Sequence, residues 1–207
     1  MPAVGVIVLA AGGSRRLGTS KQLLRDASGE TLISRAVQTA LASICRPVIV
    51  VLGAAADSIR PALDGLPVTV AVNLDWETGM AGSLQVGLAA LGEVDALGEV
   101  NAALMLLCDQ PGVTPALLNC LVDTSQTTGH ALIACDYGGA AGVPALFARS
   151  LFSDLMSLRG EQGARSVIHS YAGPLTCVPF PEGLSDVDTP ADMARLGLTA
   201  SPDADKA

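Results

Sequence analysis

The fold is decided by the opening stretch of the chain, Val4-Gly5-Val6-Ile7-Val8-Leu9-Ala10, which runs directly into Ala11-Gly12-Gly13-Ser14. Its first part is a continuous apolar run rich in β-branched residues. A strand that is covered on both faces needs such a run rather than an alternation of apolar and polar residues. The stretch therefore predicts a buried parallel strand whose carboxyl end opens into a glycine-rich loop.

Further strands and helices are expected to alternate along the rest of the chain. Short apolar runs predict strands, and amphipathic spacing or N-capping residues predict helices. The predicted strands are Val4–Ala10, Pro47–Leu52, Val68–Val72, Ala102–Leu107, Ala131–Tyr137, Pro144–Ala148 and Leu175–Val178. The predicted helical segments are Thr31–Ala42, Ala55–Leu63, Gly82–Leu91, Thr114–Asp123, Arg149–Leu158, Gly163–Tyr171 and one that Thr189 opens, with Asp192 completing a capping box.

This alternation is typical of an α/β fold with a doubly wound, mostly parallel sheet. At 207 residues without an internal repeat or linker, the chain is expected to form a single domain over residues 1–198. The polar residues 199–207 are expected to be a disordered tail.

Charge and cysteine content exclude several classes of protein. The chain has 12 Lys and Arg against 20 Asp and Glu, a net charge of −8. That balance argues against binding to nucleic acid and against a polybasic membrane surface. No apolar run is long enough for a transmembrane helix, and no charged segment precedes the first strand as in a secretory signal. The odd number of cysteines, with no C-x-x-C pair, fits a reduced, cytoplasmic compartment.

The glycine-rich loop concentrates the positive charge of this acidic chain. Four of the 12 basic residues, Arg15, Arg16, Lys21 and Arg25, follow the first strand closely. Gly13 and Gly18 have the spacing of a P-loop, but Thr19 and Ser20 intervene before the lysine, so that motif is incomplete. Backbone N–H groups between small residues bind anions. The loop predicts a cradle for a polyphosphate, with a solvated glycine turn as the alternative.

Carboxylates follow two other predicted strands. Asp109 ends the strand Ala102–Leu107, and Asp186 and Asp188 follow the last strand. Ligands of open α/β sheets bind beyond the carboxyl ends of the strands, and Mg²⁺ binds one or two carboxylates together with substrate phosphates. The alternatives are a turn residue before Pro111 and attraction of the later pair to a helix N-terminus. Together with the basic loop, these carboxylates indicate nucleotidyl or phosphoryl transfer.

At these same residues the chain resembles the MobA-like nucleotidyltransferase family, specifically its molybdenum cofactor cytidylyltransferase branch. The family signatures are matched in order along nearly the whole chain, by Leu9–Lys21, Val72–Leu88, Asp109-Gln110-Pro111, Gly142–Phe147, Gly160–Arg165 and Asp186–Pro190. Two departures lie in the later signatures, where Val143 replaces a usual His and Glu161 a usual Asp. The resemblance implies a Rossmann-like nucleotidyltransferase fold.

The resemblance also implies roles for individual residues. Arg16, Lys21 and Asp109 would be the catalytic residues, the first two neutralising the triphosphate. Asp109 and Asp188 would hold Mg²⁺. Nucleotide binding would fall to Leu9, Ala10, Ala11, Gly12, Gly13, Ser14, Arg16, Lys21, Gly79, Ser83 and Asp109. The acceptor would be bound by Asp186, Asp188, Gly142 and Pro144.

The implied reaction transfers CMP from CTP to the terminal phosphate of a pterin-phosphate acceptor, the molybdenum cofactor, and releases pyrophosphate. Relatives that use guanine tend to have Gly where this chain has Ala11, so Ala11 favours CTP. A molybdenum hydroxylase is then an expected partner. Two alternatives stay open: an accessory protein that binds and inserts the finished cofactor, and a divergent oxidoreductase or catabolic enzyme on the same fold.

Overall fold

The first strand, β1 (Ala3–Ala10), lies in the middle of the sheet of the computed structural model, which describes residues 3–14, 17–96, 98–184 and 186–200. It pairs in parallel with β2 (Val48–Leu52) on one side and with β4 (Val100–Leu107) on the other. Its side chains alternate between two hydrophobic clusters, one on each face of the sheet. Coverage on both faces is the reason that the strand is apolar throughout, as the sequence predicts.

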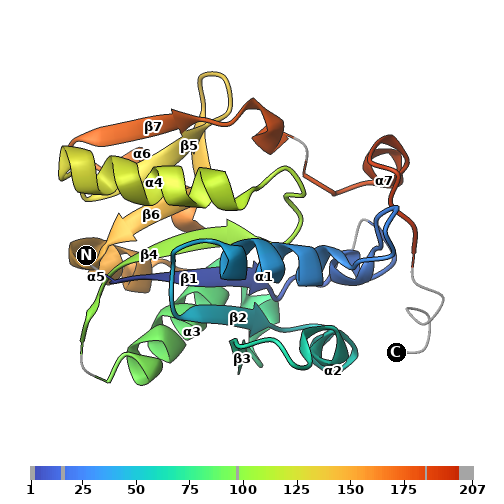
Figure 1. The fold of residues 1–207 in the computed structure, drawn as a ribbon. Helices are drawn as coiled ribbons and strands as arrows, with labels where there is room; N and C mark the ends of the chain where they lie inside the picture. The colour runs from blue at the N-terminus through green and yellow to red at the C-terminus, as the bar shows by residue number, and fades with distance from the viewer. Residues whose placement is uncertain (1–2, 15–16, 97, 185, 201–207) are drawn as a thin grey trace.

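The described residues form one seven-stranded sheet in the order β3-β2-β1-β4-β6-β5-β7 (Figure 1). The remaining strands are β3 (Thr69–Val72), β5 (Leu132–Asp136), β6 (Ala141–Ala148) and β7 (Leu175–Pro179). Only β6 runs antiparallel to its neighbours, β4 and β5. Each of the seven predicted strands has a counterpart, and the single-domain α/β fold with a mostly parallel sheet is confirmed.

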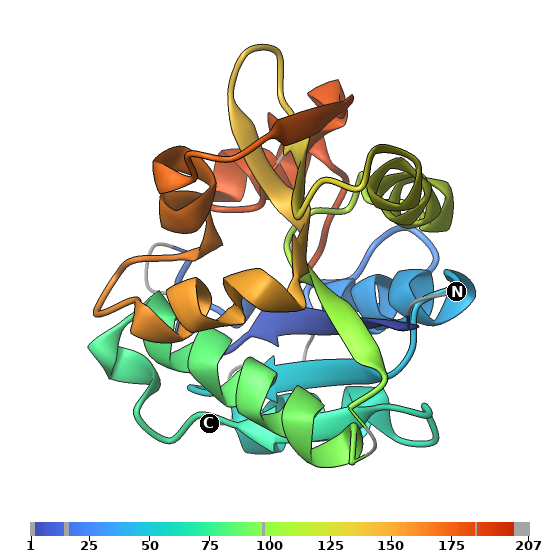
Figure 2. The same cartoon turned by 90° about the vertical axis from the view of Figure 1, so that its left-hand side faces the viewer.

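Helices cover both faces of the sheet. Buried residues of α1, α2 and α4 join the cluster on one face, and those of α3, α5 and α6 join the cluster on the other. Figure 2 shows α3 and α1 on opposite sides of β1. The helices are α1 (Leu32–Ala42), α2 (Ala56–Ile59), α3 (Met80–Val94), α4 (Pro115–Thr128), α5 (Phe152–Ser157), α6 (Ala164–Ser170) and α7 (Pro190–Arg195). Short 3-10 turns are η1 (Lys21–Leu23), η2 (Arg60–Leu63), η3 (Trp76–Thr78), η4 (Arg149–Leu151) and η5 (Pro181–Leu184).

Several predicted boundaries differ from the structure. Helix α4 continues to Thr128 rather than Asp123 and ends at Gly129, whose φ of 70° is left-handed. Its last turn carries polar residues on an exposed surface, so no apolar spacing marks it. The predicted helix Ala55–Leu63 is α-helical only to Ile59 and continues as the 3-10 turn η2, which contains Pro61. The proline has no N–H to extend the α-helical pattern.

The carboxyl end of the chain belongs to the fold for one residue longer than predicted. Thr199 and Arg25 exchange two backbone hydrogen bonds of 2.9 Å, so the predicted tail boundary at residue 199 is wrong. The pairing with Arg25 ties this residue to the segment that follows the glycine-rich loop. Residues 201–207 lie outside the described part of the chain. Among the residues that are described, no helix is long and apolar enough to cross a membrane.

One close contact sets the distance between α3 and the sheet. A Cβ atom added to Gly87 would lie 2.5 Å from Cγ2 of Ile7 and 3.0 Å from Cγ2 of Val51. Gly92, five residues further along the same helix, has no atom within 4 Å of the equivalent position. Helix α3 therefore needs glycine at position 87 but not at position 92.

We expect Gly87→Ala to destabilise the protein by about 1–3 kcal/mol, because an extra methyl group overpacks the contact of α3 with β1 and β2. Gly92→Ala is the matched control and should stabilise the protein by about 0.5–1 kcal/mol, since alanine is the better helix former. Urea unfolding of both variants checks this. Equal free energies of unfolding would contradict the packing described here.

Candidate functional site

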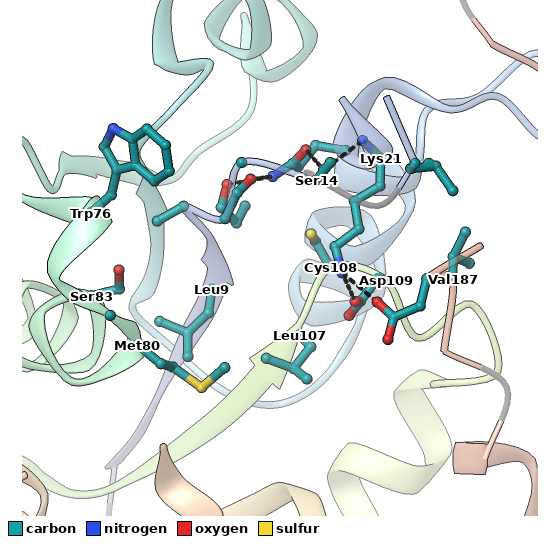
Figure 3. Close-up of a pocket in the computed structure, with 18 of the residues that line it drawn as sticks. Leu9, Ser14, Lys21, Trp76, Met80, Ser83, Leu107, Cys108, Asp109 and Val187 are labelled. Atoms are coloured by element: carbon teal, nitrogen blue, oxygen red, sulfur yellow. Dashed lines mark hydrogen bonds and ion pairs between the residues drawn. The ribbon is translucent and has the colours of Figure 1, made fainter. Parts of the chain in front are cut away.

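An open pocket of about 420 Å³ lies beyond the carboxyl ends of β1 and β4. This is the edge at which open α/β sheets bind ligands. Figure 3 shows Trp76 and Ser83 toward one end of the pocket and Lys21 and Asp109 toward the other. The structure brings together in its lining the predicted nucleotide-binding residues Leu9, Ala10, Ala11, Gly12, Gly13, Ser14, Lys21, Gly79, Ser83 and Asp109.

A lysine and two aspartates form the charged end of the pocket. The Lys21 ammonium donates a hydrogen bond to Oδ2 of Asp109 and lies 3.4 Å from Oδ1 of Asp188. Asp109 is buried, whereas Asp188 is exposed. Burial works to lower the pKa of Lys21, but the two carboxylates, Asp109 above all, outweigh it and hold the pKa above its ordinary value. Lys21 is therefore a cation at neutral pH.

The glycine-rich loop is closed by side chains rather than by regular structure. Ser14 has a left-handed backbone, with φ 49°, and its hydroxyl accepts a hydrogen bond of 3.0 Å from the backbone N–H of Lys21. This bond holds the backbone at Lys21 close to the residues that follow β1. Residues 15 and 16 lie outside the described part of the chain, so the predicted catalytic residue Arg16 is among those not placed.

Arg25, included in the predicted polyphosphate cradle, does not line this pocket. Its guanidinium donates a hydrogen bond of 2.6 Å to the carbonyl oxygen of Gly29, and its backbone bridges to Thr31 and Thr199. The reason is the turn η1, which carries the chain from the pocket at Lys21 into the pairing with Thr199. One of the four basic residues predicted to form the cradle is therefore absent from the pocket lining.

Gln22 and Trp76 are pocket residues to which sequence reasoning assigned no role. Gln22 is only 1% exposed, and its amide donates hydrogen bonds to the carbonyl oxygens of Ala10 and Gly12. The sequence feature that could have pointed to Gln22 is a polar residue placed between Lys21 and two leucines. Trp76, the one tryptophan of the chain, packs so closely that a Cβ atom on Gly13 would lie 2.9 Å from its ring.

The end of the pocket opposite Lys21 is built from the start of α3. Ser83 is buried, and its hydroxyl accepts a hydrogen bond of 3.0 Å from the side-chain amide of Asn73. Gly79 has φ 113°, and a Cβ atom there would lie 2.3 Å from the backbone of Gly160. The N–H of Ala81 donates to the carbonyl oxygen of Gly160 at 3.0 Å. These contacts fix the start of α3 against the loop that carries Glu161, another lining residue.

The predicted acceptor residues divide between two places. Asp188 lines the pocket, whereas Asp186, Gly142 and Pro144 do not. Although Asp186 and Asp188 are two residues apart in an extended segment, their carboxylates have different partners: Asp186 accepts a hydrogen bond of 3.1 Å from the Gln110 amide. Burial, with the nearby charge of Asp109, raises the pKa of Asp186. Val187 between them is fully buried.

A second polar cluster forms around Gln110, next to the pocket. Its amide also lies 3.3 Å from the Tyr137 hydroxyl and 3.3 Å from the carbonyl oxygen of Val143, the residue before Pro144. Burial raises the pKa of Tyr137 to about 12, so its phenol stays protonated at neutral pH. The cluster joins three of the sequence segments that carry the family signatures.

The charged end of the pocket suits a divalent cation. Asp109 and Asp188 converge on the single cationic atom Nζ of Lys21. Mg²⁺ is typically held by one or two carboxylates, with water and substrate phosphates filling the other positions. The described residues contain no group of three or more His, Cys, Asp or Glu side chains that would hold a metal without such help. The donor set therefore fits a metal that arrives together with a phosphorylated substrate.

The sequence of the chain matches the MobA-like NTP transferase domain over residues 6–175. It is 33% identical to a probable molybdenum cofactor guanylyltransferase of Chloroflexus aggregans, covering 93% of this chain and 95% of that protein. It is 30% identical to the purine catabolism protein PucB of Bacillus subtilis, over 93% and 96%. It is also 36% identical to nicotine blue oxidoreductase of Paenarthrobacter nicotinovorans, over 55% of this chain and only 53% of that protein.

Solved structures share the fold. Rv0371c of Mycobacterium tuberculosis superposes with a TM-score of 0.80 at 32% identity, covering 95% of this chain and 98% of that one. A structure of the same protein in complex with manganese gives a TM-score of 0.77 at 30% identity, over 94% and 97%. A nucleotidyl transferase from Methanothermobacter, at 24% identity and a TM-score of 0.78, covers 94% of this chain and 96% of that one and has the same fold.

We expect Gly79→Ala to cost more than 2 kcal/mol of stability, because a Cβ atom there adds a clash with Gly160 to a backbone conformation that L-residues avoid. Gly65→Ala is the matched control: its φ of 76° is also positive, but nothing lies within 4 Å of a Cβ atom there. That variant should lose only about 1–2 kcal/mol. Thermal unfolding compares them, and equal losses would show that the contact with Gly160 has no part in holding the pocket.

Proposed function

The chain belongs to the MobA-like NTP transferase family, and from that premise we propose that it transfers CMP from CTP to the terminal phosphate of the molybdenum cofactor. The observation that carries the proposal is the convergence of Asp109 and Asp188 on the Lys21 ammonium at the end of the glycine-rich loop. A nucleotidyltransferase needs a cationic site for the phosphates beside a cavity for the base. The proposed place of action is the cytoplasm, where free thiols such as the five of this chain stay reduced.

The proposed reaction requires little proton transfer by the protein. The acceptor's phosphate monoester is already an anion near pH 7, so it attacks the α-phosphorus of CTP without a general base. One P–O bond forms to the α-phosphorus as the bond to the β-phosphate oxygen breaks, and pyrophosphate leaves in line. Lys21 and Arg16 are the residues proposed to offset the negative charge that accumulates on the transferred group.

Asp109 and Asp188 are the residues proposed to hold Mg²⁺. The metal would supply charge neutralisation at the phosphates when bound. The contribution of the chain is to keep the two carboxylates close together on two segments that are hydrogen-bonded to each other. Asp109 follows β4, and the backbone N–H of Val187 donates to the Asp109 carbonyl oxygen at 3.3 Å, which secures the segment carrying Asp188. The manganese complex of Rv0371c is consistent with a divalent metal in this fold.

The base and ribose are proposed to lie against the loop Leu9–Gly13, with Gly79 and Ser83 at the far end of the pocket. Since the Ser83 hydroxyl already accepts a hydrogen bond from Asn73, its own proton remains available for an acceptor oxygen of the nucleotide. Ala11 supports CTP, because the guanine-using relatives tend to have glycine at this position. The similarity to a guanylyltransferase makes the choice between CTP and GTP the first one to test.

The acceptor is proposed to approach from the side of Asp188, toward the cluster of Gln110, Tyr137 and Asp186 and the adjoining strand with Gly142 and Pro144. This cluster offers a carboxylate, a phenol and an amide, groups that hydrogen-bond the polar edge of a pterin. A molybdenum hydroxylase is the proposed recipient of the product.

A second candidate function is an oxidoreductase, which the similarity to nicotine blue oxidoreductase favours. An oxidoreductase that uses a nicotinamide cofactor would consume NAD(P)H and would not release pyrophosphate from CTP. The third possibility, an accessory protein that binds and inserts the cofactor, would bind the cofactor without turnover. Pyrophosphate release and NAD(P)H oxidation, measured on the same preparation, separate the three.

We expect Lys21→Ala and Asp109→Ala each to reduce the rate of CMP transfer on the order of 10²-fold or more, because each removes charge stabilisation from the transition state. Arg60→Ala is the matched control, since it removes one positive charge from an exposed turn outside the pocket. The measurement is pyrophosphate release with CTP, Mg²⁺ and molybdenum cofactor. A rate that is unchanged in either site variant would remove this assignment.

CTP with Mg²⁺ should raise the thermal stability of the protein more than GTP or ATP does. A ligand at 100 times its dissociation constant adds about 2.7 kcal/mol, which a thermal-shift experiment detects. NAD(P)H should give no shift. Stabilisation by GTP but not CTP would contradict the argument from Ala11, and stabilisation by NAD(P)H alone would favour the oxidoreductase.

A further inference from the structure

Gln22 is a buried polar residue directly after Lys21, in the turn η1. Its amide nitrogen donates two hydrogen bonds, of 2.9 Å to the carbonyl oxygen of Ala10 and of 2.8 Å to that of Gly12. Both amide protons are therefore used on alternate carbonyl groups of the glycine-rich loop. In the described part of the chain, no backbone N–H outside the helices and strands bonds to either carbonyl.

The other end of the same amide is also fixed. Its oxygen accepts hydrogen bonds from the hydroxyls of Ser20, at 2.8 Å, and Ser14, at 3.4 Å. Two carbonyl oxygens on one side and two hydroxyls on the other leave a single orientation in which every group is satisfied. Gln22 thus connects four positions of the loop from its buried side.

This arrangement determines the direction of two backbone N–H groups. In a planar trans peptide the C=O and N–H bonds point in opposite directions. Because the carbonyls of Ala10 and Gly12 point to Gln22, the N–H groups of Ala11 and Gly13 point away from it. Both residues line the pocket, and neither N–H has a hydrogen-bond partner among the described residues. Two parallel donors of this kind suit acceptor oxygens of a bound ligand.

We propose that Gln22 is a positioning residue that aims the N–H groups of Ala11 and Gly13 at acceptor oxygens of the bound nucleotide. This inference rests on the proposed function, since it takes a nucleoside triphosphate as the ligand of the pocket. Gln22 itself does not touch the ligand in this role. It acts through the backbone of the loop, so its loss affects nucleotide affinity more than the fold.

The test is Gln22→Met, which keeps an unbranched side chain of similar length and removes all four hydrogen bonds. Gln38→Met is the matched control, because Gln38 lies on the exposed surface of α1, where its amide donates a hydrogen bond to Ser34. Dissociation constants for CTP with Mg²⁺ and for inorganic tripolyphosphate are measured by the quenching of Trp76 fluorescence. We expect Gln22→Met to weaken CTP binding about tenfold or more while kcat at saturating CTP changes less than KM, and Gln38→Met to leave binding unchanged.

The two ligands identify which oxygens the loop contacts. Equal weakening for CTP and tripolyphosphate assigns the two N–H groups to phosphate oxygens, and weakening for CTP alone assigns them to the base or ribose. A folded Gln22→Met variant that binds both ligands as tightly as the wild type would overturn the role of Gln22 and leave the proposed function standing. Wild-type protein that binds no nucleoside triphosphate would overturn both.

Amide hydrogen exchange of the wild type keeps the inference testable if Gln22→Met does not fold. The N–H groups of Ala11 and Gly13 should exchange quickly in the free protein and become protected when CTP and Mg²⁺ bind. Absence of that protection, in protein that demonstrably binds CTP, would refute the proposed direction of these groups.

Discussion

The ion pair between Lys21 and Asp109 joins the two parts of the chain on which the site depends. Lys21 ends the loop that follows β1, and Asp109 follows β4, so the pair connects the carboxyl ends of two adjacent strands. Burial alone would discourage a charged lysine here, and the carboxylates outweigh that effect. The pocket therefore contains a permanent cation with carboxylates beside it. In the proposed reaction, the phosphates of the substrate would face the Lys21 cation, and a divalent metal would face the carboxylates. The positive and negative charges in the pocket would therefore stay balanced.

Much of the fold follows from local sequence, because the inner strands β1, β2 and β4 are largely buried and helices α1, α4 and α7 each begin at a threonine N-cap. The run Val4–Ala10 predicts the inner strand β1, and the capping box of Thr189 and Asp192 is present as predicted. What the sequence does not reveal is the extent of exposed turns. The last turn of α4 carries no apolar residue facing the core, and the pairing of Thr199 with Arg25 is a backbone contact between residues far apart in the chain. Neither leaves a periodic pattern.

The pocket lining was predictable where a charged residue follows a strand or its loop, as at Asp109 and Lys21. It was not predictable where a residue acts by supporting the backbone. Gln22 hydrogen-bonds carbonyl groups whose direction is known only once the loop is folded. Trp76 fits because Gly13 leaves room for its ring and Gly53 for its Cβ atom. Asp186 and Asp188 were both expected to bind the acceptor, yet Asp186 pairs with Gln110 and Asp188 with Lys21.

The measurement that tests the central claim most directly is the product formed from CTP, Mg²⁺ and molybdenum cofactor, identified by mass spectrometry while pyrophosphate is counted. We expect one pyrophosphate for each cofactor molecule that gains a CMP unit, with no requirement for NAD(P)H. Cofactor that is recovered unchanged, with no pyrophosphate released from CTP or GTP, would contradict the assignment of this site to nucleotidyl transfer.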